Sequence, residues 1–295
     1  MKFTKKPRLF AGAAMAAIGL SLAALPALAA PVLGSDLASF AVLGSAGVTN
    51  VPTSTVGGNL GSAPNPSVGG GYIFSSGSFQ QNTALAQSAQ LQLDTAIATL
   101  NGMSISGGAL GAVQNGTTIG PGVYDFSAGL DLSGNVVLDG TGSGNTAVWV
   151  FRMVSTLITS TTSNVTVTNV GDGSGVGIYW VVGSGATLNG PTFAGNVLAH
   201  DLISSDGDLT IGCGRLLSAT TQVTLIHDKV SIGCADFGGV SGTIGGGGAF
   251  DQGADIGSGG TGGSNGQVVN GVPEPGTLAL LGLGLGAAGF MRRRR

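Results

Sequence analysis

One short segment occurs twice in this chain: Leu209-Thr210-Ile211-Gly212-Cys213 returns 21 residues later as Val230-Ser231-Ile232-Gly233-Cys234. Apolar and polar residues alternate in both copies, which is typical of short strands with one buried face. A period of about 20 residues is also typical of one turn of a β-solenoid, in which each turn stacks on the previous one. The sequence therefore predicts a mainly β chain that coils into stacked parallel strands.

Other segments have the same character. Short β-prone runs occur at residues 147–153, 165–168, 177–182 and 221–226, separated by Gly, Asn, Asp and Ser. A single helix is expected to interrupt them at about residues 78–100, where Gly and Pro are absent. One face of this helix should pack along the solenoid and its glutamine-rich face should meet water. The apolar residues at helical spacing are Leu85, Ala89, Leu93, Ala96, Ile97 and Leu100.

The N-terminus has the pattern of a secretory signal. Four basic residues within the first eight precede an apolar stretch that closes on Ala27-Leu28-Ala29, which matches a signal-peptidase site. Residues 1–30 are therefore expected to be a signal peptide. Signal peptidase would remove them during export, so they are excluded from the fold.

The C-terminus combines Pro273-Glu274-Pro275, an apolar run over residues 278–291 and the cluster Arg292–Arg295. In this order the three features resemble the PEP-CTERM sorting signal, which implies cleavage by an exosortase at the inner membrane of a Gram-negative bacterium. The apolar run is shorter than the roughly 20 residues of a stable spanning helix. We therefore expect transient inner-membrane anchoring by residues 272–295, followed by transfer to the cell surface or extracellular matrix. An ordinary C-terminal membrane helix is the other interpretation.

Between these two signals the chain is acidic and poor in charge. Residues 31–272 hold three basic residues against 13 Asp and no Glu, a net charge of −10. This balance argues against binding to nucleic acid or to anionic lipid. Residues 235–271 contain 15 glycines and lack the regular aspartates of calcium-binding glycine repeats. The glycine-rich composition of residues 235–271 predicts a flexible linker that spans about 33 Å. The folded domain is then expected to comprise residues 31–234.

The two cysteines end the two copies of the repeated segment. If the copies stack on adjacent turns, their strands lie about 4.7–4.9 Å apart, within the roughly 4.4–6.8 Å between Cα atoms that a disulfide needs. Because the periplasm is oxidising, we expect Cys213 and Cys234 to be bonded. A metal or redox pair is the alternative, but the chain has no C-x-x-C motif and only His200 and His227 could assist. We predict no metal site and no cofactor.

Catalytic motifs do not emerge from the sequence. The patterns H-E-x-x-H, G-x-S-x-G and the P-loop are absent, and the G-x-G-x-x-G match at residues 284–289 lies inside the sorting segment. Some β-solenoids cleave acidic polysaccharides with clustered Asp, Arg and Lys, but three cationic residues are too few for such a cleft. We therefore predict that the protein is not an enzyme.

A series of motifs then follows in a characteristic order around the helix. They are Phe40–Asn50, Gly57–Gly61, the helix itself, Gly120–Tyr124, Val148–Arg152, Tyr179–Gly183, Phe193–Ala199 and Gly214–Leu217. Together they resemble the ice-binding-like family of microbial antifreeze proteins over residues 33–234. The resemblance implies a discontinuous right-handed β-solenoid of triangular section. One long α-helix would lie alongside, and an N-terminal piece would complete part of the stack.

The same resemblance implies binding to an ice crystal surface. A flat, rigid array of small hydroxyls and methyls is needed for this, and a stacked sheet repeats about every 4.8 Å. The outward-facing candidates are Thr49, Ser133, Thr166, Thr168, Ser204 and Thr224. The resemblance implies that Thr49, Ser133 and Thr224 lie on the ice face. For any single threonine, β-propensity on a solvated face is the simpler interpretation.

Two features keep a second function open. The repeated T-A/G-x-T/N motifs that some relatives carry are absent, and four aspartates either interrupt the face or satisfy backbone groups at corners. These are Asp131, Asp139, Asp206 and Asp208. The alternative is a matrix or adhesion module that uses the same flat face to bind exopolysaccharide or neighbouring cells, for example in a biofilm.

Overall fold

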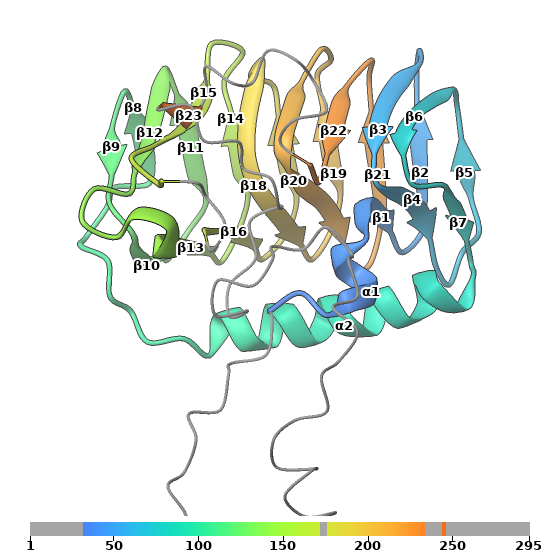
Figure 1. Ribbon diagram of the computed structural model, residues 1–295, viewed down its shortest axis with the longest axis horizontal. Helices are drawn as coiled ribbons and strands as arrows, with labels where there is room; N and C mark the ends of the chain where they lie inside the picture. The colour runs from blue at the N-terminus through green and yellow to red at the C-terminus, as the bar shows by residue number, and fades with distance from the viewer. Residues whose placement is uncertain (1–31, 172–175, 234–243, 246–295) are drawn as a thin grey trace, which may run out of the picture.

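The computed structural model describes residues 32–171, 176–233 and 244–245, and it consists mainly of parallel strands (Figure 1). One 15-stranded sheet contains a strip that faces the long helix, which we call the helix-side strip. In spatial order its strands are β10 (Gly122–Phe126), β13 (Val148–Met153), β16 (Gly177–Val182), β18 (Thr192–Ala199), β20 (Thr210–Ser218), β1 (Phe40–Gly44), β4 (Asn59–Ser62) and β7 (Phe79–Gln81).

The remaining strands of this sheet form a second strip. It continues from the first through β18 and β20, whose early residues pair in the second strip and whose later residues pair in the first. Its other strands are β9 (Thr118–Ile119), β12 (Asn135–Asp139), β15 (Asn164–Thr168), β22 (Lys229–Ser231), β3 (Ser54–Gly57), β6 (Tyr72–Ser76) and β23 (Ile244–Gly245).

A separate eight-stranded sheet forms another side of the stack. All of its pairings are parallel. In spatial order its strands are β5 (Val68–Gly69), β2 (Gly47–Asn50), β21 (Gln222–Leu225), β19 (Ile203–Ser205), β17 (Ala186–Leu188), β14 (Leu157–Thr159), β11 (Leu130–Ser133) and β8 (Val113–Asn115).

The order of strands in space differs from their order in the chain. The N-terminal strands stack against the last strands of the domain, so that Val42 pairs with Leu216 and Val48 pairs with Val223. Figure 1 shows the blue N-terminal strands beside the orange C-terminal ones. This arrangement confirms that an N-terminal piece completes the stack.

The core follows from the alternation of apolar and polar residues along each strand. In β14, for example, Leu157 and Thr159 are buried while Ile158 is exposed. Inside the stack, equivalent positions of successive turns lie above one another and carry aromatic rings. The Phe151 ring stacks on Tyr124 at 5.4 Å and on Trp180 at 4.2 Å between centroids. Such pairs add to the hydrophobic stabilisation from area burial.

The long helix α2 (Ala84–Asn101) returns the chain from one end of the stack to the other (Figure 1). Its 18 residues span about 27 Å at about 1.5 Å per residue, which is comparable to the helix-side strip that it covers. It buries Ala89, Leu93, Ala96 and Leu100, as the helical spacing predicts, and also Ala86. The other two predicted residues, Leu85 and Ile97, are half-buried.

The predicted start of this helix at residue 78 is wrong. Residues Phe79–Gln81 instead form strand β7, which pairs with β4 at the edge of the sheet. The helix begins after Thr83, whose hydroxyl accepts a hydrogen bond from the Ala86 amide at 3.3 Å. A threonine N-cap of this kind supplies one of the acceptors that the first turn lacks. The helix ends at Asn101, within one residue of the predicted end at about residue 100, and Gly102 caps it.

A second, short helix α1 (Ser35–Ala38) was not expected, because a single helix was predicted. It explains why the glutamine-rich face of α2 does not simply meet water. The side-chain oxygen of Gln92 accepts hydrogen bonds from the amides of Asp36 and Leu37 at 3.0 and 2.9 Å. Gln92 thus satisfies two backbone donors at the start of α1 and joins the two helices. A 3-10 turn at Gly144–Thr146 precedes β13.

The repeated segment stacks in a different register from the predicted one. Thr210 pairs with Lys229, and Ile211 pairs with Val230, so the turn is two residues shorter than the sequence repeat. A shift of two residues leaves each side chain on its own face, which is why the apolar alternation still matches. Cys213 is 6% exposed and is not a free thiol. Its expected partner Cys234 lies outside the described residues.

Several predicted segments fall outside the described part of the chain. These are the signal peptide at residues 1–30, most of the linker at residues 235–271 and the sorting segment at residues 272–295. Two residues of the predicted linker, Ile244 and Gly245, instead form β23 and pair with Val167 and Thr168 of β15. Within the described ranges, the helices are too short or too polar to cross a membrane.

Candidate functional site

The eight-stranded sheet carries a row of small hydroxyl side chains on its outward face, which we call the hydroxyl row. Four residues in register form it: Thr187 pairs with Ser204, Ser204 with Thr224, and Thr224 with Thr49. They come from β17, β19, β21 and β2 and lie between buried neighbours on their strands. The row therefore projects from the sheet rather than into the core.

The spacing along this row is set by the backbone. Adjacent strands lie about 4.7–4.9 Å apart, so the hydroxyls repeat at that interval. The Thr49 hydroxyl donates a hydrogen bond to the Thr224 hydroxyl at 3.2 Å, which orients both groups. Because threonine has a restricted χ1 angle, its methyl and hydroxyl groups are already held in place. Contact with another surface therefore costs little side-chain entropy.

The row is rigid because the residues beneath it are closely packed. Leu188, Ile203, Val223 and Val48 lie on the inner side of the same strands and are fully buried. Interiors packed to this degree resist deformation. The outward face should therefore keep its shape when it meets another surface.

The chemistry of the row changes toward β11. Thr187 is followed by Ile158 and then by Asp131, which are in register with it. The Ile158 side chain is 41% exposed, so an apolar position continues the flat array. Asp131 places a carboxylate at the far part of the row. The hydroxyl row is thus uniform over four strands and mixed beyond them.

The structure separates the six predicted site residues into two groups. Thr49, Ser204 and Thr224 lie together in the hydroxyl row, and Ser133 lies in the same sheet, two positions after Asp131 on β11. The other two, Thr166 and Thr168, lie on β15 in the 15-stranded sheet. The structure therefore does not bring all six residues to one face.

Sequence reasoning missed Thr187 of the hydroxyl row and Ile158, which is in register with it on the next strand. Both lie in three-residue strands, Ala186–Leu188 and Leu157–Thr159, which are too short to show a clear alternation. A signal was present, because each has a buried apolar residue directly before it and a buried residue directly after it. It becomes readable only once the register between turns is known.

The second strip carries a different row of polar side chains. Asn164 donates to the Asn135 side-chain oxygen at 3.2 Å, and its own side-chain oxygen accepts from the Thr192 hydroxyl at 2.7 Å. Thr192 is in register with Thr210, and Thr210 with Lys229. The amides and hydroxyls at one end of this row bond to one another, and the row then reaches a cationic side chain. It is less uniform than the hydroxyl row.

Four aspartates were expected either to interrupt the face or to occupy corners, and the structure contains examples of each. Asp131 lies in the hydroxyl-row register, whereas Asp139 ends β12. The Asp139 carboxylate accepts from the Asn169 side chain at 2.8 Å and from the Thr141 amide at 3.0 Å. The bond from Asn169, followed by those from Thr141, lowers the pKa of Asp139. Asp206 and Asp208 are exposed after β19.

Each histidine lies at an exposed corner and is paired with an aspartate. His200 contacts Asp201 at 2.9 Å and His227 contacts Asp208 at 2.6 Å, each through Nδ1. The bond from His200, and then that from Thr220, lowers the pKa of Asp201. No group of three His, Cys, Asp or Glu side chains suited to a metal occurs among the described residues.

Asp228 is buried at the corner between β21 and β22, where it connects the C-terminal turns to the N-terminal part of the chain. It is 1% exposed and accepts hydrogen bonds from the amides of Leu209 and Ile226 at 3.0 and 2.8 Å, and from the Ser205 hydroxyl. Its own amide donates to the Ser54 hydroxyl at 2.8 Å, on the N-terminal part. Burial raises the pKa of Asp228, while these hydrogen bonds oppose the rise.

The stacked parallel sheets define a class of mainly β proteins, and comparison with known proteins identifies the family. The model of the ice-binding-like family matches residues 42–231, and that of the PEP-CTERM protein-sorting motif matches residues 271–295. The first match covers more than half of the chain. The chain therefore belongs to the ice-binding-like family.

Individual relatives support this assignment. An ice-binding protein of Nostoc sp. (strain HG1) is 36% identical over 204 residues, which cover 66% of this chain and 72% of the relative. One from Flavobacterium frigoris (strain PS1) is 28% identical over 216 residues, which cover 66% and 74%. The crystal structure of an ice-binding protein from the Antarctic ascomycete Antarctomyces psychrotrophicus is 29% identical and matches with a TM-score of 0.59, covering 68% of this chain and 97% of that one.

Proposed function

We propose that this protein binds ice through the outward face of its eight-stranded sheet, centred on the hydroxyl row. The observation that carries the proposal is the register of Thr187, Ser204, Thr224 and Thr49, which places one small hydroxyl on each of four adjacent strands. The named relatives are ice-binding proteins, which supports the same ligand.

The physical basis is a match between two ordered surfaces. Hydroxyls that repeat about every 4.8 Å can order water in a lattice-like arrangement, and the threonine methyls limit competing hydration. The face is well suited because the row has no cation, and its first carboxylate, Asp131, lies two strands beyond Thr187. No bond to the ligand is made or broken, so we propose a non-catalytic role.

We extend the proposal to the finer features of the fold and to export. The successive turns β10–β12 and β13–β15 each contribute three strands, one to each strip and one to the eight-stranded sheet, whereas β18 and β20 each run through both strips; this supports a triangular section, and we take the coil to be right-handed. The sorting motif supports export, with removal of residues 1–30 by signal peptidase and processing near Pro273, Glu274 and Pro275 by an exosortase. After transient anchoring in the inner membrane, the protein would reach the cell surface or matrix.

The proposal is tested by measuring thermal hysteresis and ice recrystallisation inhibition of the purified exported protein. A heat-denatured sample serves as the control. We expect a freezing gap or arrested crystal growth. A folded protein without either effect would contradict ice binding and favour the matrix or adhesion role, in which exopolysaccharide or neighbouring cells are bound.

The face itself is tested by a pair of matched substitutions. Thr224→Tyr places a large ring in the hydroxyl row and should remove most of the ice activity, because the ring holds the flat array away from the crystal. Thr210→Tyr makes the same change at a half-buried threonine of the second strip and should leave the activity unchanged. Both proteins must show wild-type circular dichroism. Equal loss in both variants, or in Thr210→Tyr alone, would place the ice face elsewhere.

A further inference from the structure

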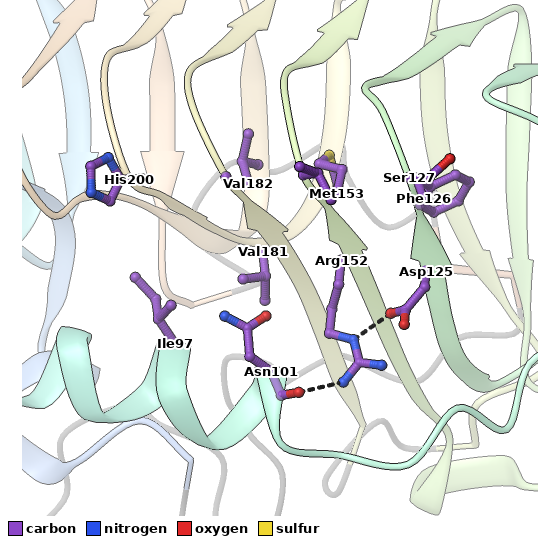
Figure 2. Close-up of a pocket in the computed structure, with 12 residues that line it drawn as sticks. Ile97, Asn101, Asp125, Phe126, Ser127, Arg152, Met153, Val181, Val182 and His200 are labelled. Carbon is purple, nitrogen blue, oxygen red and sulfur yellow. Dashed lines mark hydrogen bonds and ion pairs between the residues drawn. The ribbon is translucent and has the colours of Figure 1, made fainter.

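An open pocket of about 690 Å³ lies between the C-terminal part of α2 and the ends of β10, β13 and β16 (Figure 2). Its size is within the range of small-molecule sites, roughly 300–1,000 Å³. Apolar side chains form much of its wall, among them Ile97, Val154 and Val181. Val154 is 72% exposed, so a large apolar side chain faces solvent at this pocket.

Polar groups converge on the same space. Arg152 lies between the helix and the sheet, where its Nη1 donates to the carbonyl oxygens of Leu100, Asn101 and Met103 at 3.1, 2.9 and 2.7 Å. Its Nε donates to Asp125. These contacts hold the guanidinium in one orientation. A fixed polar group of this kind can bind a ligand without first losing conformational entropy.

Hydrogen-bonding capacity is left over in this arrangement. Within the described ranges, Nη2 of Arg152 makes no hydrogen bond, and Figure 2 shows it turned away from Asn101. The Asp125 side chain remains 44% exposed. The Asn101 amide and the His200 ring also line the pocket. The Asn101 amide and the exposed Asp125 carboxylate therefore supply a donor and an acceptor beside an apolar wall.

The charge of Arg152 is compensated within the pocket by Asp125, its ion-pair partner. His200 is hydrogen-bonded to Asp201 through Nδ1. A charged ligand would have to compete with the Arg152–Asp125 pair, whereas a neutral ligand would not. A sugar ring fits this pattern, because each hydroxyl both donates and accepts and the C–H faces of the ring are apolar.

We propose that this pocket binds one sugar unit of a neutral polysaccharide. The inference goes beyond ice binding and does not depend on it, since the pocket is lined by α2 and the helix-side strip while the hydroxyl row lies on the other sheet. The two sites would let a protein in the extracellular matrix hold a polysaccharide and keep its flat face free.

The test uses the purified exported protein with ¹³C-labelled methyl groups. The probes are glucose, galactose, mannose, maltohexaose and cellohexaose, each titrated to about 100 mM because a single-sugar site is expected to be weak. We expect the methyl signals of Ile97, Val154 and Val181 to shift and saturate with at least one probe. No shift with any of the five would overturn the proposal. Glucuronate is the charged comparison, and a response to it alone would also overturn it.

A matched pair of variants distinguishes the pocket from other sites. Val154→Glu places a carboxylate beside Asp125 and should raise the Kd by about tenfold or more. Val51→Glu makes the same change at a valine that is 74% exposed and lies outside the pocket, and it should leave the Kd unchanged. Unaltered binding by Val154→Glu would refute the site. The ice activity of Val154→Glu should equal that of wild type. Failure of the sugar-binding proposal can therefore be distinguished from failure of the ice-binding proposal.

Discussion

Arg215 joins the N-terminal part of the chain to the C-terminal turns, and its removal should weaken the whole fold. The side chain is 0% exposed. Its Nε and Nη2 donate to the Ala38 carbonyl at 3.2 and 2.7 Å, and its Nη1 donates to the Asn196 side-chain oxygen at 2.8 Å. Ala38 is 177 residues away in the chain, so these bonds cross the seam between the two parts.

The expected loss for Arg215→Met follows from these contacts. The three hydrogen bonds to Ala38 and Asn196 come from a charged donor and contribute about 1.5–3 kcal/mol each, or about 4.5–9 kcal/mol together. Methionine fills much of the same volume and relieves the cost of burying a charge, which recovers several kcal/mol. We expect a net decrease in the free energy of unfolding of about 3–5 kcal/mol. For a domain of this size that lowers the Tm by about 6–20 °C.

Urea and thermal unfolding, followed by far-ultraviolet circular dichroism, measure this loss. Lys229→Met is the control, because it removes a cation from an exposed position on β22 and should change the free energy of unfolding by at most about 0.5 kcal/mol. An Arg215→Met protein within about 1 kcal/mol of wild type would refute the reasoning. The seam would then depend on strand pairing and apolar packing alone.

Two further predictions concern the disulfide and the buried carboxyl. Replacing Cys213 and Cys234 by Ser should lower the free energy of unfolding by about 3 kcal/mol under non-reducing conditions. The reason is that the disulfide would close a loop of about 20 residues in the unfolded chain. Unchanged thermal unfolding would exclude the pairing. Asp228 has a raised pKa, so its contribution to stability is full below its ordinary value of 3.8 and declines as pH rises above it. The stability difference between wild type and Asp228→Asn, from urea midpoints between about pH 3 and 7, should therefore shrink with rising pH, and a constant difference would contradict this.

Local patterns were sufficient to predict most individual elements. The run at residues 177–182 is strand β16, and the helical spacing of apolar residues identified the buried face of α2. The start of the helix was predicted too early, because Phe79–Gln81 forms a strand that pairs with β4. The paired residues Leu60 and Phe79 are 19 residues apart in the chain. Helix α1 was missed because four residues carry almost no periodic signal, and its start depends on Gln92 from α2.

The candidate site shows where local patterns stop. Thr49 and Thr224 are separated by 175 residues, and their side chains are hydrogen-bonded. Thr166 has the same residue type and a similar half-buried position, but β15 belongs to the other sheet. No local property of a threonine tells which side of the stack its strand will join.

By itself, the sequence determined that this is an acidic, mainly β chain with a long helix and a sorting motif, because composition, alternation and short motifs are properties of nearby residues. Only the tertiary structure decided which side chains share a face. The repeated segment, for example, stacks with Thr210 beside Lys229 rather than beside Ser231. The register depends on the length of each corner and on packing between turns, and these couple residues that lie far apart in the chain.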